Sequence, residues 1–522
     1  MAVASSGEGS QGQIAEWFRG RSVLVTGGSG FIGKVLLEKL LRSLPQLGAV
    51  YVLLRGKRGD SPAARLENIK RLPLFDRLRR TDPAALQRLH AVGGDVLRAD
   101  LGLQAADRAR LLAEVSVVFH CAASLRLEAG LRAAVEHNAA GTLRLLHLCR
   151  RMRHLQVIVH LSTAFCHCEQ ELLEEKIYPP PHDPHDIMHL VQWLDEKSLA
   201  SITPKLLGPH PNCYTYSKRL AESLVYEESK NMPAVICRPS IVTPVFSEPL
   251  TGWVDNLNGP VGILIGAGKG VIRSMLCGPD FCAEIIPVDI AVNGIITAAW
   301  DTATNRKTDE MPVYNLSTSS LVQITWGEVL ERGRQIVYEN PFEGAVWYPD
   351  GNIRTNETVH YLHVLLFHIF PAYLIDFLLL LTLQKRFMVK LQNRISNGLK
   401  VLQYFTLRQW NFDNKEILAL CSRMTKEDCE TFYMANVEYD VDSYLLSCVL
   451  GARQFCMKEP LSSLPRARRH LKMLYWLDWL VKMMCVGFLL YVMYQYARPS
   501  KALVISSVDS LKLSGAINSF IS

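Results

Sequence analysis

The stretch SVLVTGGSGFIGK, residues 22–34, determines how the amino-terminal half of the chain folds. Its first part, Ser22–Thr26, is a short apolar run that leads into glycine, as a buried strand does. Apolar residues then recur at positions 32, 36, 40 and 44, which is the spacing of one helix face over Phe31–Leu44. The stretch therefore predicts a strand that turns through glycines directly into a helix.

The turn has the spacing G-x-x-G-x-x-G, with glycines at positions 27, 30 and 33. In such a turn one glycine permits the tight bend, one lets the backbone approach a pyrophosphate and one lets helix and strand pack closely. Bound phosphates then face the positive end of the helix. The alternative is a glycine turn without a ligand, which the position between strand and helix disfavours. The residues expected to form this dinucleotide cradle are Thr26, Gly27, Gly28, Ser29, Gly30, Phe31, Ile32 and Gly33.

Outward from this unit, strand and helix patterns alternate as far as Trp300. Further strands are expected at Ala49–Leu54, His90–Asp95, Val115–His120 and Gln156–Leu161, and further helices at Ala133–Met152 and Tyr214–Lys230. Such alternation predicts an α/β fold of the Rossmann type, with a doubly wound parallel sheet.

The end of the second expected strand indicates which dinucleotide binds, because its sequence is Leu54-Arg55-Gly56-Lys57-Arg58. An NAD enzyme usually has an acidic residue here, whereas a basic residue suits the 2′-phosphate of NADPH. We therefore expect NADPH as the cofactor, with Arg55 as the main contact and Lys57 and Arg58 behind it. The alternative is a solvated basic loop.

A second motif, Tyr-x-x-x-Lys, lies at Tyr214 and Lys218. Residues four apart share one face of a helix, so the lysine charge can lower the pKa of the tyrosine hydroxyl and also hold the nicotinamide ribose. The tyrosine can then donate a proton to the oxygen formed by hydride attack. An earlier strand ends in Ser162-Thr163, and a hydroxyl from either residue can orient the substrate carbonyl. The alternative for the motif is an ordinary surface pair.

Longer stretches around these motifs resemble one enzyme family. They are TGGSGFIGKVLLEKLLR (26–42), VFHCAA (118–123), HLSTAF (160–165), YTYSKRLAE (214–222), RPSIV (238–242), GWVDNLNGP (252–260) and LPRARRHL (464–471). With them the chain resembles the alcohol-forming fatty acyl-CoA reductases of animals, which are extended short-chain dehydrogenase/reductases. The resemblance implies a four-electron reduction: a long-chain acyl-CoA takes one hydride, the hemithioacetal expels CoA, and the aldehyde takes a second hydride to give a primary alcohol.

The same resemblance implies roles for individual residues. Tyr214 is the proton donor, Lys218 is its partner, and Ser162 or Thr163 is the third member. Asn138 in NAAGT supports the lysine through water. At the cofactor the resemblance places Asp95 near the adenine, Cys121 and Ala122 beside the dinucleotide, and Arg238 of the RPSIV stretch.

The interval between Ser162 and Tyr214 is much longer than in ordinary short-chain dehydrogenases. We expect the inserted stretch to be either a lid or acyl-chain wall beside the active site, or a surface excursion that touches no substrate. Its histidines at positions 182, 185 and 189 are interpreted as solvated. No metal is expected at Cys166-His167-Cys168, because alternate residues of a strand point to opposite faces and no second ligand pair is evident.

Net charge, the amino-terminal residues and cysteine content exclude several classes of protein. A formal net charge of +7 over 522 residues is too mild to indicate nucleic acid, and none is expected as a partner. Residues 1–13 contain no apolar run, so no secretory signal is expected and the catalytic part should face the cytosol. The 13 cysteines include no CxxC pair and are interpreted as reduced thiols.

The carboxyl-terminal part contains two strongly apolar segments. Met483–Tyr496 is uncharged but spans only roughly 21 Å, short of the hydrocarbon core. Leu471–Tyr496 is long enough but contains Asp478 and Lys482, which can pair one helical turn apart. It is expected to be a transmembrane, interfacial or buried helix. The cluster Arg466, Arg468, Arg469 and Lys472 keeps the chain before it cytosolic.

The other apolar segment, 359–383, contains three histidines, Pro371 and Asp376, which favour a membrane-surface or substrate-channel element over a span. The resulting organisation is a flexible amino terminus (1–14), a reductase domain (15–350), a helical carboxyl-terminal domain (355–465), a membrane-associated helix (471–496) and a tail (497–522). Membrane lipid is thus an expected partner, at the peroxisome or the endoplasmic reticulum.

Two alternatives to the acyl-CoA reductase remain. A sterol dehydrogenase or nucleotide-sugar epimerase shares both motifs, but such enzymes generally lack the insertion and the helical carboxyl-terminal domain. A non-catalytic NADPH-binding protein would not require the Tyr214/Lys218 pair. The sequence does not indicate the oligomeric state or the preferred acyl chain length.

Overall fold

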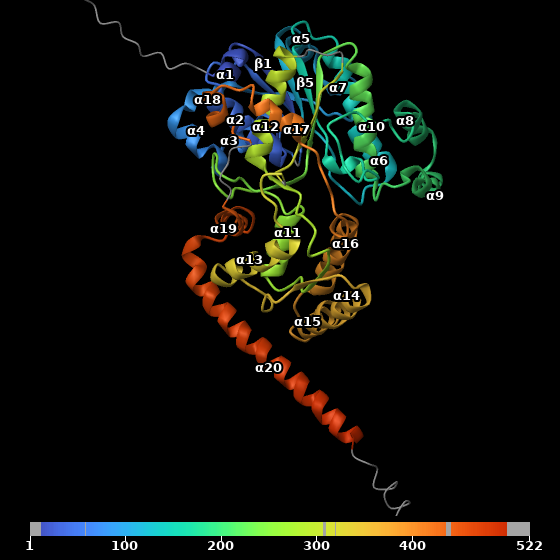
Figure 1. Cartoon of the computed structure of the whole chain (residues 1–522), viewed down its shortest axis with the longest axis vertical. Helices are drawn as coiled ribbons and strands as arrows, with labels where there is room; N and C mark the ends of the chain where they lie inside the picture. Colours follow the sequence, from blue (N-terminus) through green and yellow to red (C-terminus); the bar gives the residue numbers. More distant parts are fainter. Residues whose placement is uncertain (1–11, 58, 306–309, 319, 435–439, 498–522) are drawn as a thin grey trace, which may run out of the picture.

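A parallel sheet of seven strands forms the centre of the upper part of the molecule in Figure 1, in the order β10-β6-β5-β4-β1-β2-β3. The structure is a computed structural model that describes residues 12–57, 59–305, 310–318, 320–434 and 440–497. The strands are β1 (Ser22–Thr26), β2 (Val50–Leu54), β3 (Leu89–Gly93), β4 (Val115–His120), β5 (Val157–Leu161), β6 (Ala234–Pro239) and β10 (Val313–Leu316). The predicted doubly wound α/β fold is confirmed.

The strand order reverses at β1, which has β2 on one side and β4 on the other. Thr26 and His120 are partners at the carboxyl ends of β1 and β4. In doubly wound sheets the crevice outside this reversal point is where ligands bind. The glycine turn follows Thr26 and therefore lies at this crevice.

Helices cover both faces of the sheet, and the side chains of β1 show the division. Val23 and Val25 face one apolar core with α2 (Phe31–Ser43) and α12 (Val288–Thr304). Leu24 faces a second core, formed with α5 (Ala105–Glu114), α7 (Gly141–Cys149) and α10 (Cys213–Glu228). Burial on both faces explains why the strands are apolar runs. Peripheral elements are α3 (Pro62–Lys70), α4 (Asp76–Thr81), α6 (Leu131–Val135), β7 (Ile241–Thr243) and β9 (Ile285–Pro287).

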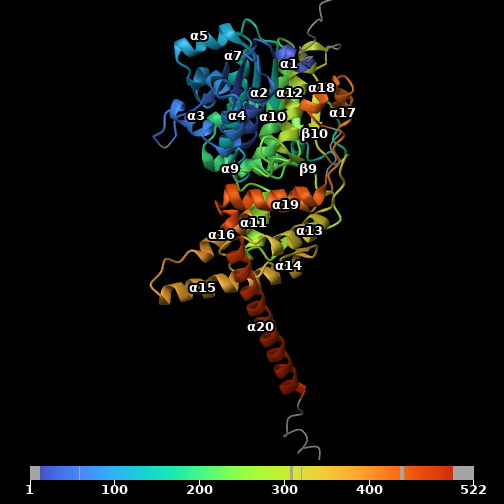
Figure 2. The same cartoon turned by 90° about the vertical axis from the view of Figure 1, so that its left-hand side faces the viewer.

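A smaller lower lobe hangs beneath the crevice and is built from segments far apart in the sequence, 259–278, 326–407 and 440–497 (Figures 1 and 2). Two short strands, β8 (Ser274–Leu276) and β11 (Asn352–Arg354), pair within it. Its helices are α11 (Pro260–Gly268), α13 (Trp326–Glu339), α14 (Glu357–Val364), α15 (Phe370–Leu381), α16 (Met388–Thr406), α19 (Val441–Gly451) and α20 (Leu464–Ala497).

The two lobes do not follow the predicted domain boundaries. Segments 259–278 and 326–350, which the sequence placed in the reductase domain, belong to the lower lobe. Conversely, α17 (Lys415–Cys421) and α18 (Lys426–Thr431) lie on the upper lobe, where Ile417 and Leu420 join the core beneath α12. Helix α1 (Gln13–Phe18) begins inside the stretch predicted to be flexible, and buried Ile14 holds it there. Residues 1–11 and 498–522 lie outside the described residues.

Helix α20 begins on the lower lobe and then leaves it (Figure 2). Ala467, Leu471 and Leu474 are buried against the lobe. The predicted pair of Asp478 and Lys482 is present, at 2.5 Å between Nζ and Oδ2. The uncharged residues 483–496 are exposed, except Val492, which is partly buried.

Candidate active site

The glycine turn fits a dinucleotide because glycine is required at two of its positions. Gly27 has a φ of +73°, and a Cβ on it would lie 2.6 Å from the backbone of Cys121 and Ala122. A Cβ on Gly33 would lie 2.3 Å from the Gly27 carbonyl oxygen. No side chain caps α2 at Gly30, so the first N–H groups of the helix face the turn. The turn therefore forms an open cradle of a kind that suits an anion, and Cys121 and Ala122 lie at its edge.

The basic residue after β2 lies at the same edge of the sheet. Arg55 is 53% exposed at its side chain, and its Nη1 lies 3.6 Å from Oδ2 of Asp95. The structure thus brings together Arg55 and Asp95, both predicted to bind the cofactor. Lys57 is exposed and bridges to Asp60 through backbone bonds. Arg58 lies outside the described residues.

Tyr214 stands in the first turn of α10, which Asn212 caps by accepting a hydrogen bond from Thr215 N–H at 3.0 Å. The Tyr214 hydroxyl is hydrogen-bonded with Thr163. Burial raises the pKa of Tyr214, and the bond with Thr163 opposes that rise. The pKa is therefore raised rather than lowered as predicted, so the hydroxyl is protonated at neutral pH and can donate a proton.

Thr163 and Ser162 are in different surroundings. Thr163 lines the same cavity as Tyr214. Ser162 is buried, and its Oγ lies 3.7 Å from Sγ of Cys166. Of the two hydroxyls left open by the sequence, the Thr163 hydroxyl is therefore the one beside the tyrosine.

Lys218 is buried one helical turn after Tyr214. Its Nζ donates a hydrogen bond to the Leu161 carbonyl oxygen at 2.6 Å and lies 3.4 Å from Nε2 of His160. Burial lowers the pKa of Lys218 to about 8. The ammonium is thus held between β5 and α10 by its bonds to His160 and Leu161.

Asn138 lies in a single π-helical turn, Glu136–Ala140, between α6 and α7. Its Nδ2 donates a hydrogen bond to Oγ of Ser217 at 2.9 Å, and its Oδ1 accepts one from Ser124 N–H at 2.8 Å. These bonds tie the loop after β4 to α10 at the residue next to Lys218. Asn138 is thus placed to position the motif through Ser217.

Arg238 does not point toward the cradle, which corrects its predicted cofactor role. Its buried guanidinium binds both carboxylate oxygens of Glu222, at 2.9 and 2.7 Å, and it also donates to the carbonyl oxygens of Glu174 and Lys176. Burial opposes ionisation, but the charge of Arg238 holds the pKa of Glu222 well below its usual range. Arg238 therefore anchors the start of the insertion to α10.

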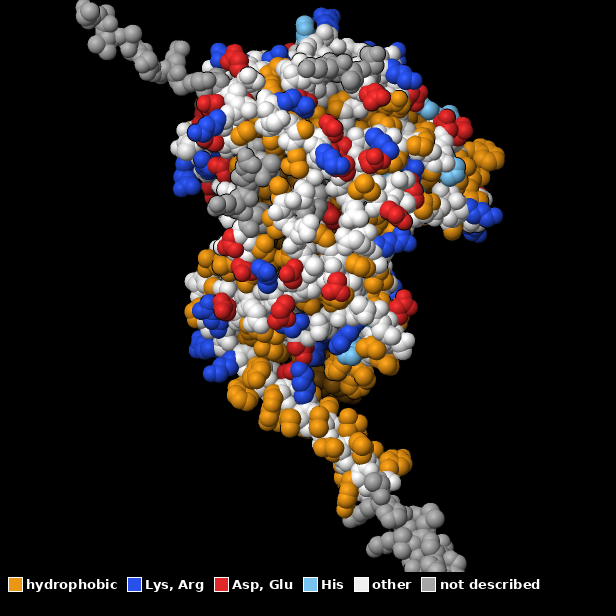
Figure 3. All heavy atoms as spheres, in the orientation of Figure 1, with side chains coloured by type: hydrophobic (Ala, Val, Ile, Leu, Met, Phe, Trp, Pro, Cys, Tyr) orange, Lys and Arg blue, Asp and Glu red, His pale blue; other side chains and the backbone are white. Residues whose placement is uncertain are grey.

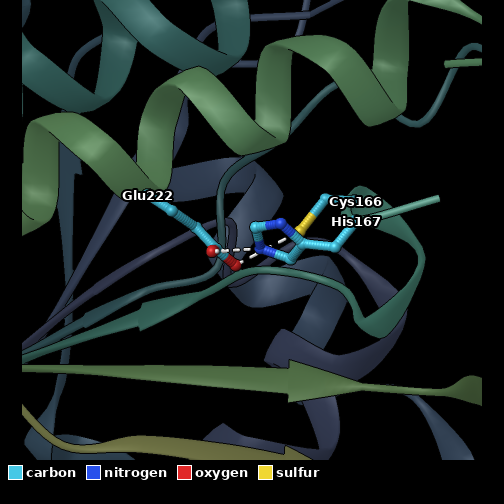
Figure 4. Close-up of side chains that lie close together, drawn as sticks. All are labelled: Cys166, His167 and Glu222. Atoms are coloured by element: carbon cyan, nitrogen blue, oxygen red, sulfur yellow. Dashed lines mark hydrogen bonds and ion pairs between the residues drawn. The ribbon is translucent and has the colours of Figure 1, made fainter. Parts of the chain in front are cut away.

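Figure 4 shows Cys166 and His167 pointing at Glu222, and their possible ligand atoms lie within 4.8 Å of one another. Nε2 of His167 lies 2.9 Å from Oε2 of Glu222, and Sγ of Cys166 lies 3.3 Å from Oε1. A metal ion would have to displace Arg238 from both oxygens. Because that arginine already neutralises the carboxylate, the group is better described as a buried hydrogen-bond network than as a metal site.

An apolar cavity of about 310 Å³ opens at Tyr214 and extends into the lower lobe. That volume lies at the lower end of the range of about 300–1,000 Å³ that is usual for ligand pockets. Its upper wall includes Thr163, Phe165 and Tyr214. Below these residues it is lined by Pro260, Ile263, Leu264, Ala267, Ile272, Met275, Trp326, Val329, Leu330, Gly333, Val337, Ile353, Leu402 and Phe405, among others. A long apolar group can therefore reach down from the tyrosine.

The two helices of the insertion do not supply this cavity wall. Helices α8 (Pro184–Trp193) and α9 (Glu196–Leu207) pack beside α6 on the outside of the upper lobe, and neither contributes a lining residue. The surface-excursion interpretation therefore fits these two helices. His182 and His189 are exposed, and His185 pairs with Glu227.

Two groups of residues were not identified from the sequence. His120 and His160 are buried at the centre of the sheet, and His120 joins Thr26 to Thr142 through bonds of 2.7 and 2.9 Å. Burial lowers the pKa of His120 to about 3, so it is neutral. The cavity wall is the second group. The histidines in VFHC and VHLS could have been identified from the sequence, because ionisable residues are uncommon in a buried strand. The residues of the cavity wall belong to no local motif that could have identified them.

The fold and these side chains define an oxidoreductase of the extended short-chain dehydrogenase/reductase type. Two family models described as male sterility protein match residues 25–295 and 367–459, and the first is a nucleotide-binding model. Among solved structures, the terminal R domain of the myxalamid pathway has a TM-score of 0.56 at 21% identity and covers 83% of this chain and 90% of its own. The R domain of a Mycobacterium tuberculosis nonribosomal peptide synthetase has a TM-score of 0.55 at 16% identity, covering 83% and 91%.

Curated relatives define the family more narrowly. The chain is 38% identical over 461 residues to fatty acyl-CoA reductase 1 of Xenopus laevis and 37% identical to that of Homo sapiens, covering 88% of this chain and 89% of each relative. It is 37% identical over 465 residues to fatty acyl-CoA reductase 2 of Bos taurus, with the same coverage. The chain belongs to the fatty acyl-CoA reductase family.

Proposed function

We propose that this chain uses NADPH to reduce long-chain acyl-CoA to a primary alcohol. The observation that carries this proposal is the apolar cavity, which begins at Tyr214 and continues between α11, α13 and α16. A thioester carbonyl beside Tyr214 and Thr163 would leave its acyl chain in that cavity. Sugar nucleotides would require polar groups where this wall is apolar.

In the proposed reaction four side chains of the site have separate roles. Thr163 orients the carbonyl oxygen, and Tyr214 donates its proton to the oxygen that becomes negative. Lys218 supplies a positive charge beside the tyrosine when it releases its bond to Leu161, and Asn138 positions the motif through Ser217. Each bound NADPH would supply one hydride, so two molecules bound in succession would complete the four-electron reduction. The same proton donor then serves thioester and aldehyde in turn.

NADPH is preferred over NADH in this proposal because Arg55 is the side chain at the end of β2. The glycine cradle would hold the pyrophosphate, and the exposed guanidinium of Arg55 would meet a 2′-phosphate. An NAD enzyme usually has a carboxylate where Arg55 stands.

Membrane attachment belongs to the same proposal. Helix α20 leaves the lower lobe after Lys482, and most of its apolar side chains beyond that point are exposed. Insertion of residues 483–497 into a bilayer removes this surface from water. A long acyl chain and its alcohol also partition into bilayers, so the enzyme and its substrates would share one surface.

The direct test is turnover by the purified full-length protein in mild detergent. With NADPH and palmitoyl-CoA we expect NADPH oxidation, free CoA and hexadecanol, with two molecules of NADPH consumed per alcohol; NADH should support much slower turnover. A second arm replaces palmitoyl-CoA with a UDP-sugar or a hydroxysterol. Absence of NADPH oxidation with every acyl-CoA, or turnover in the second arm alone, would refute the proposal.

Filling the cavity should shorten the acyl chain that the enzyme accepts. Gly333 of α13 lines the cavity, and a Cβ built on it meets nothing within 4 Å. We expect Gly333→Phe to raise the KM for palmitoyl-CoA at least tenfold, by blocking a chain whose burial contributes about 0.8 kcal/mol per methylene, while octanoyl-CoA is still reduced. Gly398→Phe is the matched control, because Gly398 is also helical and open but does not line the cavity. Equal effects on both chain lengths would contradict the prediction.

A further inference from the structure

The apolar segment 357–381 has its polar and apolar sides reversed relative to a helix on a soluble protein. His360, His368 and Asp376 are buried, with 5%, 3% and 8% of their surface exposed. Phe370 and Phe377 are 65% and 55% exposed. A helix that buries its polar side chains and exposes its aromatic ones is stable only if an apolar phase covers the outer face.

The buried polar side chains are bonded to the lower lobe. Nδ1 of His360 lies 2.8 Å from Oγ of Ser274, and Nε2 of His368 accepts a hydrogen bond from Arg273 N–H at 2.8 Å. Asp376 caps α16 by accepting hydrogen bonds from three backbone N–H groups at 2.9 to 3.0 Å. Crossing a bilayer would break all of these bonds. The segment is therefore fixed against the lobe, although its length and composition would suffice for a span.

The outer face of this segment is hydrophobic, as is the exposed part of α20. Figure 3 shows hydrophobic side chains gathered at the lower end of the lobe and continuing along α20. In Figure 2, α15 runs across the base of the lobe, whereas α20 points away from it. The exposed apolar side chains of the segment are Val359, Tyr361, Leu362, Leu365, Leu366, Phe367, Ile369, Phe370, Tyr373, Leu374, Phe377, Leu378, Leu380 and Leu381.

Charge around this face fits a bilayer surface. Lys385 and Arg386 are exposed directly after α15, and Arg466, Arg469 and Lys472 are exposed at the start of α20. Anionic lipid headgroups attract such residues. Trp476 and Trp479, both exposed on α20, are of the type that concentrates at membrane interfaces.

We propose that the segment 357–381 lies in the plane of the membrane and seats the lower lobe on the bilayer, as a second attachment beside the tip of α20. This inference rests on the membrane attachment proposed above and adds a surface to it. Its inner side bonds to β8 at Ser274, and β8 and β11 line the cavity. The floor of the acyl cavity is then one helix away from lipid, where an alcohol product can enter the bilayer.

The test compares four full-length proteins by flotation with phosphatidylcholine vesicles that contain phosphatidylserine. They are the natural chain, an α15 variant (Phe370→Glu, Leu374→Glu, Phe377→Glu), an α20 variant (Phe488→Glu, Tyr491→Glu) and the combination of both. We expect each variant to lower the vesicle-bound fraction severalfold and the combination to abolish binding. The control variant Leu172→Glu, Trp193→Glu, Tyr226→Glu places three glutamates, as many as the α15 variant, on exposed apolar positions of the upper lobe, and should float normally.

Two results would overturn the inference. One is equal flotation of the combination and of the α20 variant alone. The other is a natural chain that is oligomeric in detergent while the α15 variant is monomeric, since the face would then bind a second copy. The reductase proposal fails by a different measurement, if the natural chain does not reduce any acyl-CoA. If the reductase proposal holds, the α15 variant should reduce octanoyl-CoA in detergent at the natural rate.

Discussion

Tyr214→Phe should lower kcat for palmitoyl-CoA reduction by about 10²–10⁴-fold, which is the usual contribution of a positioned general acid. In the proposed reaction the Tyr214 hydroxyl donates the proton, and burial raises its pKa, so it is protonated across the neutral range. Phenylalanine keeps the ring and removes only the oxygen. NADPH affinity, measured by the fluorescence of the bound nucleotide, should remain within a few fold of the natural value.

Tyr216→Phe is the matched control for this substitution. Tyr216 belongs to the same turn of α10, is buried, and bonds through its hydroxyl to Nδ1 of His182 at 2.9 Å, but it does not line the cavity. Its removal should leave kcat nearly unchanged. A Tyr214→Phe protein that turns over within a few fold of the natural chain would exclude the tyrosine as the proton donor. A lower melting temperature together with lost NADPH binding would make its role structural.

The dinucleotide-binding half of the molecule could be predicted from the sequence because each of its motifs consists of residues that are close together in the chain. A strand, a glycine turn and a helix follow one another within residues 22–43, and the apolar runs at β2, β3, β4 and β5 lie within two residues of the predicted strands. Burial on both faces of a parallel sheet leaves a continuous apolar run in the sequence. Tyr214 and Lys218 were equally readable, since one helical turn joins them.

The lower lobe could not be read in this way because its contacts are long-range. Gly333 and Leu402 meet in one cavity although neither belongs to a motif. The predicted boundary at residues 350–355 lies inside the lower lobe, because the chain passes between the lobes several times. Arg238 was assigned from its neighbourhood in a recognised stretch, and its actual partner, Glu222, is sixteen residues earlier on another element. The Arg238 side chain points into the buried network and away from the cofactor edge, and local sequence does not encode such a direction.

Glu222→Gln should destabilise the protein by about 3–5 kcal/mol, the cost of leaving a buried charge without its partner. Arg238 is fully buried, and Glu222 is the carboxylate that contacts its guanidinium. The substitution keeps the volume and removes the charge, so the loss is electrostatic rather than a cavity effect. Thermal or denaturant unfolding in detergent measures it. Glu227→Gln, on the same helix but in an exposed pair with His185, should change stability by no more than about 0.5 kcal/mol.

The pH dependence of the same pair gives an independent check. The folded-state pKa of Glu222 lies well below the value of about 4.3 expected in the unfolded chain. Its stabilising contribution is therefore complete above that value and is lost as pH falls below it toward the folded-state pKa. The stability difference between the natural chain and Glu222→Gln should be constant from neutral pH to about pH 5 and shrink below about pH 4. A difference that is already falling at neutral pH would mean that another group, such as His167, carries the effect.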